Sequence, residues 1–252
     1  MENSLTIDKF SKSYGKLRAV DELSLTIHPG EAVAFIGPNG AGKSTTMRAI
    51  AGLLLPDAGR IAIAGHDIQE DPVHARENLG YVPQDLELYP YLTGPELLQF
   101  VARIRNISQN VADERIEELL EICDLKNASG KLIREYSGGM ARKMAMAAAL
   151  LPQPSLTVLD ESFVGLDPES TFKLQKYLMR YTKNGGSLLI SSHILPLLQT
   201  LCSRFFIIHH GKCVADLTSA ELDKKLDDPA HDTLTALYLH LTDQAHLIQE
   251  MS

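Results

Sequence analysis

Short apolar runs divide the chain into strand-like and helix-like regions. Strand-like runs occur first, at residues 5–10, 23–27, 32–36 and 61–64, with turns at residues 28–30 and 56–59. Between residues 94 and 151 the pattern becomes helical, at 95–104, 111–123 and 138–151. Strand-like runs return at 156–159, 187–190 and 205–208, with a helix-like stretch at 168–181. Because alternating strands and helices are typical of a parallel sheet, we expect an α/β core with a small antiparallel sheet and an inserted helical block.

The remaining features of the pattern limit the class of protein. After residue 220 the chain is polar and helix-prone, with an apolar stripe formed by Leu234, Leu237 and Leu241. No apolar run approaches the length that a membrane span needs, so we expect no transmembrane segment. The 252 residues suffice for one large α/β domain or a core with an inserted subdomain. The scattered histidines His231, His240 and His246 lack the context of a metal site, and we expect them on the surface.

Charge and cysteine content narrow the choice of partners and compartment. The formal net charge of −8 gives no basic footprint, so we expect no nucleic-acid partner and no direct binding to anionic lipid. The cysteines Cys123, Cys202 and Cys213 have no CxxC spacing. They fit reduced thiols of a cytosolic protein, and we expect them to serve in packing.

A glycine-rich segment directly follows the apolar run at 32–36 and matches the pattern G-x-x-x-x-G-K-[ST]. It consists of Gly37, Pro38, Asn39, Gly40, Ala41, Gly42, Lys43, Ser44 and Thr45. Glycines let the backbone wrap closely around phosphate oxygens, the lysine adds a positive charge, and the helix predicted at 44–51 presents its N-terminus to anions. Ser44 is placed to offer its hydroxyl to Mg²⁺. The segment predicts a nucleoside triphosphate site, but it fits a kinase, a GTPase or a motor equally well.

Two acidic residues end the apolar run at 156–159. A carboxylate at the tip of a buried strand beside a phosphate loop is where Mg²⁺ needs a ligand or a water-mediated anchor, and Asp160 fits that part. Glu161, one residue later, could accept a proton from an attacking water or orient it. Without the upstream loop, the same residues would also fit an ordinary charged end of a strand.

A second helix suited to an anion begins at Ser137, Gly138 and Gly139. Serine is a good N-cap, and the two glycines leave the N–H groups of the first turn uncovered. The alanine- and methionine-rich stretch after them is typical of a buried helix. By itself this pattern is also that of a capped, tightly packed structural helix.

With these segments in this order, the chain resembles the ATP-binding-cassette (ABC) ATPases over nearly its whole length. Residues 136–140 are similar to the family signature L-S-G-G-Q, which basic residues follow, here Arg142 and Lys143. The chain departs from the family pattern at Met140 in place of glutamine, Tyr136 in place of leucine and Ser162 in place of proline. The departure at 140 removes any contact that the glutamine side chain would make, and leaves the backbone of the signature intact.

The resemblance assigns roles to further residues. It implies that Tyr14 stacks on adenine, that Gln84 binds Mg²⁺ and senses a transmembrane partner, and that His193 contacts the γ-phosphate. It also implies that residues 162–167 link two active sites. A lone tyrosine or a lone histidine at the end of a strand would otherwise indicate only a structural role.

The resemblance also implies an architecture. We expect an α/β fold of the P-loop NTPase (RecA-like) type, a parallel-sheet core with an N-terminal antiparallel β subdomain and an inserted α-helical subdomain. The expected single ABC ATPase domain covers residues 1–252. Within it, 1–85 hold the β subdomain and the phosphate-binding part of the core, and 86–150 hold the helical subdomain with the signature. Residues 151–220 form the catalytic core, and 221–252 a C-terminal helical tail.

One chain cannot apply both phosphate-binding helix ends to one nucleotide. The resemblance therefore implies a homodimer that encloses two ATP molecules with Mg²⁺ and reopens after hydrolysis. The interval from Gln84 to Ser137 has room for a compact helical subdomain but not for the long coiled coils of chromosome-maintenance relatives. Residues 88–98 resemble the ABC-2-type exporter ATPases. We expect a cytoplasmic subunit, peripheral on the inner face of the cell membrane, that binds a separate integral membrane permease and powers transport, with export as the direction.

Two other classes compete with this interpretation. A stand-alone P-loop enzyme would need an acceptor site or a guanine-reading N-K-x-D motif, and the sequence has no such tetrad. A regulatory or non-transport ABC ATPase with weak turnover is the stronger rival, because Met140 replaces the usual glutamine. Glu161 and His193 argue against it. The sequence does not identify the transported substrate.

Overall fold

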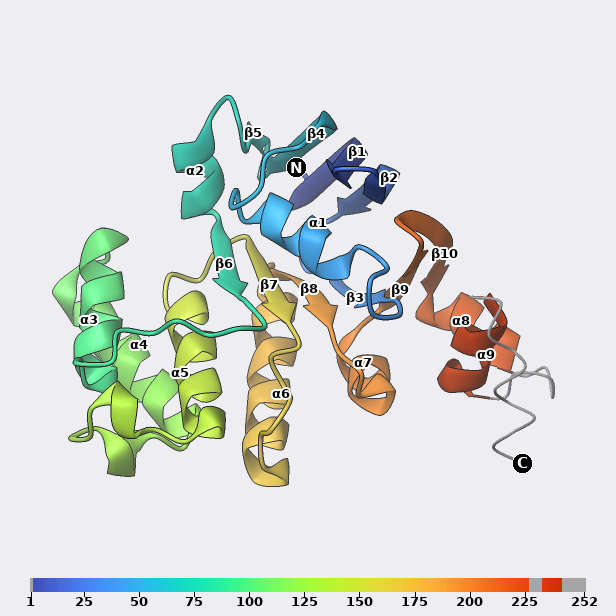
Figure 1. The fold of residues 1–252 in the computed structure, drawn as a ribbon. Helices are drawn as coiled ribbons and strands as arrows, with labels where there is room; N and C mark the ends of the chain where they lie inside the picture. Colours follow the sequence, from blue (N-terminus) through green and yellow to red (C-terminus); the bar gives the residue numbers. More distant parts are fainter. Residues whose placement is uncertain (1, 227–232, 242–252) are drawn as a thin grey trace.

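The computed structural model describes residues 2–226 and 233–241, and its strands form two sheets (Figure 1). In the main sheet the order is β10-β9-β3-β8-β7-β6, with parallel pairing from β9 to β6 and β10 antiparallel to β9. The strands are β3 (Ala32–Ile36), β6 (Leu79–Val82), β7 (Leu156–Asp160), β8 (Ser187–Ser191), β9 (Arg204–His209) and β10 (Lys212–Thr218). The expected parallel core is confirmed.

An antiparallel sheet covers one side of this core, with the order β2-β1-β4-β5. Its strands are β1 (Leu5–Tyr14), β2 (Leu17–Ile27), β4 (Ala58–Ile63) and β5 (His66–Asp67). The helix α1 (Lys43–Ile50) lies between the two sheets, in contact with β2 and β4 on one side and with β7 on the other (Figure 1). This arrangement places the phosphate loop, which immediately precedes α1, at the junction of the two sheets.

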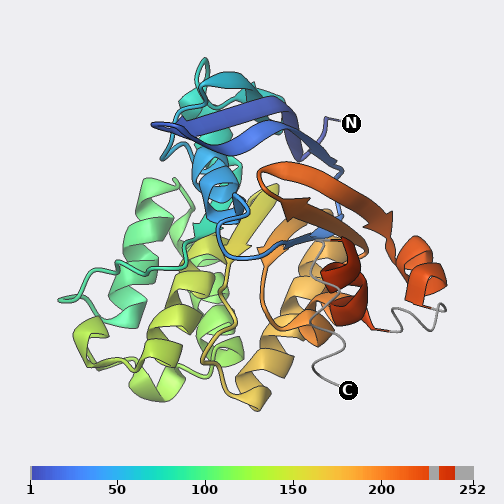
Figure 2. The same cartoon turned by 45° about the vertical axis from the view of Figure 1, so that its right-hand side comes forward.

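The other helices lie around the main sheet. They are α2 (Pro72–Glu77), α3 (Gly94–Ile104), α4 (Gln109–Ile122), α5 (Gly138–Leu150), α6 (Pro168–Lys183), α7 (Leu195–Leu201), α8 (Ser219–Leu226) and α9 (Leu234–Leu241), with short 3₁₀ turns at Lys126–Ala128 and Ile133–Glu135. The helices α3, α4 and α5 contact one another and form a helical block at one edge of the sheet (Figure 2). Near the opposite edge, α8 and α9 pack together.

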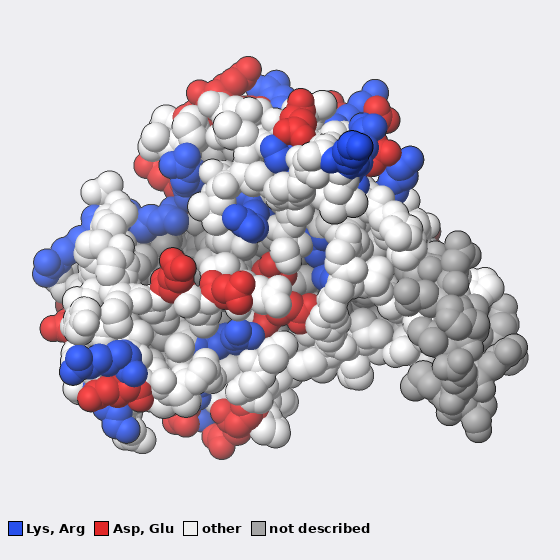
Figure 3. All heavy atoms as spheres, in the orientation of Figure 1, with Lys and Arg blue, Asp and Glu red and all other residues white. Residues whose placement is uncertain are grey.

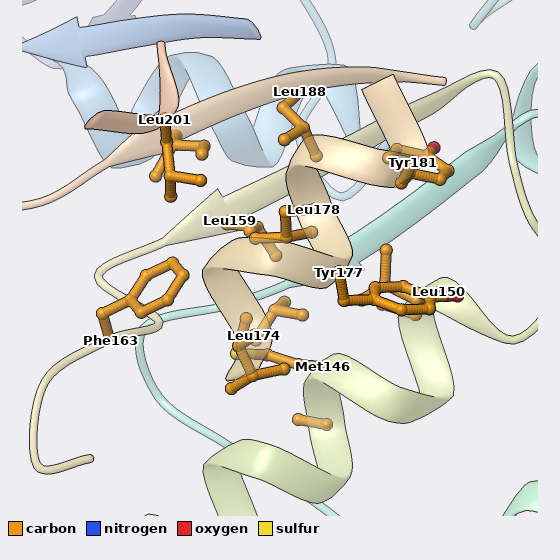
Figure 4. Packing of buried hydrophobic residues seen from close by; sticks show 14 of the residues in the cluster. Met146, Leu150, Leu159, Phe163, Leu174, Tyr177, Leu178, Tyr181, Leu188 and Leu201 are labelled. Carbon is orange, nitrogen blue, oxygen red and sulfur yellow. The ribbon is translucent and has the colours of Figure 1, made fainter. Parts of the chain in front are cut away.

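Two hydrophobic cores lie on the two faces of the main sheet, and alternation along β3 shows why. Ala32, Ala34 and Ile36 join a core formed with the helical side, whereas Val33 and Phe35 join the core under the antiparallel sheet. A strand buried on both faces needs an unbroken apolar run, which the sequence has at residues 32–36. Figure 4 shows the helical side, where Leu174 and Leu178 of α6 lie among Met146 of α5 and Leu159 of β7.

Several elements were not expected from the sequence. No strand was expected at residues 79–82, although β6 pairs with β7 there. Gly80 weakens the apolar pattern of that segment, and the structure explains the glycine, since a Cβ atom would collide with the carbonyl oxygen of Ala149 on α5. The helices α2 and α7 and the short strand β5 were also missed, as was β10, an exposed polar edge strand that forms a hairpin with β9.

Other expectations are resolved residue by residue. Leu234 and Leu237 on α9 are buried, as the apolar stripe predicts, and His240 is exposed. His231 and His246 lie outside the described residues. Cys123 and Cys202 are buried in the core, but the packing role expected for Cys213 is wrong, because this residue is exposed on β10. Acidic and basic side chains are interspersed over the face drawn in Figure 3.

Candidate functional site

The phosphate loop connects β3 to α1, and packing requires two of its glycines, one of which the backbone conformation requires as well. A Cβ atom at Gly37 would lie 2.5 Å from the carbonyl oxygen of Ile208 on β9. At Gly42 the backbone has φ 106°, and a Cβ atom would lie 2.5 Å from the carbonyl oxygen of Ala19 on β2. The glycines therefore let the loop sit tightly between β9 and β2 while its outer side stays open.

Lys43, the first residue of α1, is buried at the centre of the loop. Its Nζ donates hydrogen bonds to the carbonyl oxygens of Gly37, at 2.6 Å, and Pro38, at 3.1 Å. Burial lowers the pKa of Lys43, while the negative charges of Glu161 and Asp160 act in the opposite direction. The ammonium is thus held by its own loop and faces two carboxylates.

The carboxyl end of β7 supplies both acids, and the end of β8 supplies a hydroxyl beside them. Asp160 is buried, and its Oδ1 accepts a hydrogen bond of 2.6 Å from the hydroxyl of Ser191 at the end of β8. Burial, with the negative charge of Asp160, raises the pKa of Tyr81 on β6 to about 12. Ligands of open α/β sheets bind beyond the carboxyl ends of the strands, and these acids lie at that edge.

Glu161 combines burial, an uncommon backbone conformation and an unsatisfied oxygen. Its φ of 48° lies in the left-handed region, a conformation that costs about 1–3 kcal/mol in residues other than glycine. Backbone bonds hold it there, because its N–H donates to the carbonyl and hydroxyl oxygens of Ser191. Its Oε2 accepts from the N–H of His193 at 3.2 Å.

The second carboxylate oxygen of Glu161 has no hydrogen-bond partner within the described part of the chain, although it is buried. The Nε2 atom of His193 lies 3.3 Å from this Oε1, which is an ion-pair distance when the ring is protonated, but the geometry does not make a hydrogen bond. Buried polar atoms are rarely left without a partner, and those that are often belong to catalytic groups. This oxygen is an acceptor available to a water molecule.

A pocket of about 430 Å³ brings these groups together. The residues predicted from the sequence that line it are Tyr14, Asn39, Gly40, Gly42, Lys43, Ser44, Thr45, Gln84, Asp160, Glu161 and His193. Gly37, Pro38 and Ala41 belong to the same loop but do not line the pocket. Ser137, Gly138 and Gly139 do not line it either.

Two lining residues, Leu17 and Ala19, were not predicted. Both lie on β2, just after the turn that follows Tyr14. Leu17 is 67% exposed and Tyr14 is 47% exposed, so two apolar side chains stand in the open at one side of the pocket. A flat apolar ligand group could pack there. In the sequence, Leu17 is only a leucine next to a glycine turn. That pattern does not show whether the side chain contacts a ligand or simply lies at the edge of a sheet.

The N-terminus of α5 has a different setting. Ser137 caps its own helix, since its hydroxyl oxygen accepts from the N–H of Met140 at 3.3 Å. Ser137 and Gly138 are exposed, and a Cβ atom at Gly138 would meet nothing within 4 Å among the described residues. Gly139 packs on the loop after β7, where a Cβ atom would lie 2.8 Å from the carbonyl oxygen of Gly165.

Arg142, on the second turn of α5, joins the two regions, and the sequence analysis gave it no role beyond its place after the signature. It donates to the carbonyl oxygen of Glu161 at 2.7 Å and to that of Gln84 at 3.2 Å. Lys143 is buried and donates to the hydroxyl of Ser170 at 2.9 Å. The local sequence does not indicate that Arg142 and Lys143 have different partners. Their partners are known only from the tertiary structure.

Comparison with known proteins identifies the family. A model of the ABC transporter family matches residues 20–164. The linearmycin resistance ATP-binding protein LnrL of Bacillus subtilis (strain 168) is 34% identical to this chain, over 97% of this chain and 78% of that protein. The Nod factor export ATP-binding protein I of Burkholderia lata is 36% identical, over 81% and 67% of the respective chains.

Solved structures agree with this assignment. An ATP-binding subunit of an ABC transporter superposes with a TM-score of 0.88 at 31% identity, covering 94% of this chain and 98% of that chain. Within the described residues, the helices are all too short or too polar to cross a bilayer. The chain belongs to the ABC transporter family, as an ATP-binding subunit with ATPase activity.

Proposed function

We propose that this chain powers an exporter by hydrolysing ATP in the pocket at the junction of its two sheets. One observation carries the proposal. The phosphate loop, the acids at the end of β7, Gln84 and His193 line a single pocket, although they are far apart in sequence. The tight fit of the loop glycines supports a site made for phosphates, and the buried Oε1 of Glu161, which accepts no hydrogen bond within the described part of the chain, supports an attacking water.

In this proposal the residues of the loop hold the triphosphate. Backbone N–H groups of the loop residues that line the pocket, from Asn39 to Thr45, and the ammonium of Lys43 bind the β- and γ-phosphates, and the N-terminus of α1 adds its dipole. Tyr14, which lines the pocket and is exposed, stacks on the adenine. The contacts of Lys43 with the loop carbonyls keep its charge at the place where the phosphates enter.

The donor set fits Mg²⁺ as the companion of ATP. Ser44, Gln84 and Asp160 line the same pocket and offer a hydroxyl, an amide and a carboxylate oxygen, which are the hard ligands that this ion prefers. When bound, the ion would neutralise charge that develops on the phosphate oxygens. The bond from Ser191 fixes the orientation of the Asp160 carboxylate and leaves its other oxygen available.

Glu161 activates the water in this proposal. Its Oε1 accepts a proton from the water that attacks the γ-phosphorus, and its Oε2 remains bonded to the N–H of His193. The exposed ring of His193, whose Nε2 lies 3.3 Å from Oε1, would contact the γ-phosphate. A positioned base of this kind contributes about 10²–10⁴-fold to a rate.

A second copy of the chain completes the site. The N-terminus of α5 presents uncovered N–H groups at Ser137, Gly138 and Gly139, yet these residues do not line the pocket of their own chain. A homodimer in which each α5 end faces the partner's phosphate loop would use both helix ends. Met140 then supplies only its backbone where the family has a glutamine side chain.

A separate membrane permease is the proposed partner, on the inner face of the membrane. An apolar groove lies between β6 and the helical block, close to Gln84, and is lined by residues that include Tyr81, Leu86, Leu88, Val101, Ile104 and Ala145. Next to it stand Tyr89 and Tyr91, which are 56% and 73% exposed. We propose that a cytoplasmic helix of the permease occupies the groove. The names of the relatives, one for drug resistance and one for export, support export as the direction.

The same proposal assigns functions to the parts of the domain. Residues 1–85 and 151–220 would hold ATP and hydrolyse it, and residues 86–150 would carry the signature and the permease contact. The helices α3, α4 and α5, which contact one another, support the second unit. Residues 221–252 would form a helical tail, of which 227–232 and 242–252 lie outside the described residues.

The substitution Glu161→Gln tests the proposal. The amide cannot take the proton, so ATP turnover should fall by about 100-fold or more, while ATP still binds and holds the dimer closed. Phosphate release and light scattering after size exclusion measure the two effects. The matched control is Glu114→Gln, at an exposed position on α4, which should leave both unchanged.

Unchanged turnover in Glu161→Gln would remove the assignment of the base, and a mutant that stays monomeric with ATP would argue against the shared site. The permease part has its own test. Affinity purification of the tagged chain from solubilised membranes should recover an integral membrane protein, and the substitution Leu88→Arg in the groove should abolish that recovery while ATP binding persists.

A further inference from the structure

A cluster of two histidines and an aspartate lies outside the nucleotide pocket, at the edge of the antiparallel sheet. Asp71 Oδ2 lies 2.8 Å from His66 Nδ1, and Asp71 Oδ1 lies 2.7 Å from His74 Nδ1. The two rings are 5.2 Å apart between centroids and inclined by 29°. One ligand-type atom from each of the three side chains lies within 4.8 Å of the others.

The local fold holds the three residues in register. His66 begins β5, whereas Asp71 precedes α2 and His74 lies on its first turn. The connection between them is tied by Asp67, whose carboxylate accepts hydrogen bonds from the backbone N–H groups of residues 69 and 70. The N–H of Asp71 also donates to the carbonyl oxygen of Asp67 at 2.9 Å. Both histidines are therefore presented to one carboxylate by a fixed turn.

Nearby basic groups do not occupy this carboxylate. Within the described ranges, the ion pairs of Asp71 are those with His66 and His74. The adjacent guanidinium of Arg60 pairs instead with Asp67, at 2.5 Å, and with Glu70, at 2.7 Å. Each oxygen of Asp71 thus faces one imidazole nitrogen.

We propose that His66, Asp71 and His74 form a binding site for a divalent transition metal of the zinc class. Imidazole nitrogen and carboxylate oxygen are ordinary zinc ligands, whereas Mg²⁺ and Ca²⁺ prefer oxygen alone. Bonds of about 2.0–2.1 Å place tetrahedral zinc ligands about 3.4 Å apart. One ligand atom from each of the three side chains already lies within 4.8 Å of the others, so these separations need to change by roughly 1.5 Å or less.

The side chains are free to make that adjustment. His66, Asp71 and His74 are 38%, 40% and 60% exposed, so small rotations disturb no core packing. Three protein ligands leave the fourth position of a tetrahedral ion to water. The bound ion cross-links β5 to α2, and α2 leads through β6 to Gln84. The site therefore stabilises the outer edge of the antiparallel sheet and stands apart from the hydrolytic reaction.

Zinc binding by the whole purified chain tests the proposal. After treatment with a chelator, the protein is titrated with Zn²⁺ against a chromophoric zinc indicator. We expect the wild type to bind one Zn²⁺ per chain, and we expect the affinity for this ion to fall at least tenfold in His66→Ala and in His74→Ala. The variant His74→Gln keeps a polar side chain but removes the imidazole, and it should show the same loss. Thermal unfolding should shift upward with Zn²⁺ in the wild type and less in these variants.

Two matched controls separate this site from others. His28→Ala removes an exposed histidine at the end of β2, and His193→Ala removes the histidine beside Glu161. Both should keep the equivalent of zinc that the cluster variants lose. The proposal is overturned if the wild type binds no Zn²⁺ in competition with the indicator. It is equally overturned if His66→Ala and His74→Ala bind as tightly as the wild type, or if His193→Ala loses the same equivalent.

Discussion

The chain contains two helices that begin with a glycine-rich N-terminus, and their surroundings differ. The N-terminus of α1 is enclosed, because Lys43 is buried against the loop carbonyls and faces Asp160 and Glu161 across the pocket. The N-terminus of α5 is exposed to solvent and is capped by the side chain of Ser137, and its residues 137–139 do not line that pocket. Both present uncovered N–H groups. Within the described residues, however, a cation and two carboxylates surround the α1 end, whereas the α5 end lines no part of the nucleotide pocket.

A helix N-terminus therefore becomes a candidate phosphate site through the side chains that surround it. In the proposed function the α1 end holds a triphosphate by itself, because Lys43, the proposed metal ligands and the proposed base line one pocket there. The α5 end would contribute backbone donors and the hydroxyl of Ser137, whose contribution grows once water is excluded by a partner. Arg142 on α5 donates hydrogen bonds to the backbone carbonyls of Glu161 and Gln84. A movement of α5 would therefore shift the backbone at these two residues.

Mixing two inactive variants is the strongest test of this comparison. Lys43→Met damages the α1 end, and Gly138→Asp places a carboxylate at the α5 end, where the structure has space for it. Each variant alone should lose about 100-fold or more of its ATP turnover. In a mixed dimer one composite site keeps both ends intact, so turnover should rise above either variant alone. No gain on mixing would contradict a site shared between copies.

The same two variants should differ in how the monomer binds ATP. Loss of a charged hydrogen-bond donor costs about 1.5–3 kcal/mol, so Lys43→Met should bind ATP roughly 10–100-fold more weakly. Gly138→Asp should bind as the wild type does at protein concentrations where no dimer forms. Isothermal titration with ATP measures both. If Gly138→Asp weakened the monomer as much as Lys43→Met, the α5 end would belong to the pocket of its own chain.

Removing the link between the two regions should have a smaller effect. In Arg142→Gln the carbonyl oxygens of Glu161 and Gln84 lose the hydrogen bonds from the guanidinium, and we expect turnover to fall by roughly tenfold because the proposed base is misplaced. ATP affinity of the monomer should stay within twofold. The control is Arg134→Gln, whose guanidinium stacks on the exposed ring of Tyr91. Equal effects of the two substitutions would show that the hydrogen bonds of Arg142 to the two carbonyls do not position the proposed base.

The smallest effect concerns pH. Burial lowers the pKa of Lys43 from its usual 10.5, so part of its charge is lost at a pH where an exposed lysine keeps it. ATP binds the protonated form, and its affinity should therefore fall several-fold as the pH rises from 8 toward 10. In Lys43→Met the affinity should be flat over that range. Parallel curves for the two proteins would show that another group titrates.

Much of the candidate site could be predicted from the sequence because its residues belong to short local patterns. The loop from Gly37 to Thr45 and the acids at 160 and 161 are each contiguous, and each follows a strand that its apolar run made visible. Tyr14, Gln84 and His193 lie alone in the sequence, and only the family resemblance selected them. The structure places all three at the same pocket.

Other features could not be predicted because distant backbone atoms create them. Gly80 interrupts the apolar pattern of β6, and a glycine is needed there because a carbonyl oxygen of α5 lies too close for a side chain. The two carbonyl oxygens that Arg142 contacts belong to loops that follow two different strands. The cluster of His66, Asp71 and His74 depends on a turn whose geometry Asp67 fixes. In each case the residue type is common, and its role becomes visible only through a contact with residues that are distant in the sequence.

The sequence alone determined that this protein binds a nucleotide, because the chemistry of phosphate recognition needs glycines, a lysine and acids in local order. The apolar runs likewise determined an α/β core, since a strand buried on both faces must be apolar throughout. Only the folded chain shows that acids and a lysine surround the α1 end and that, among the described residues, no such groups line a pocket at the α5 end. That distinction depends on which strand ends meet at one edge of the sheet, which no local pattern records.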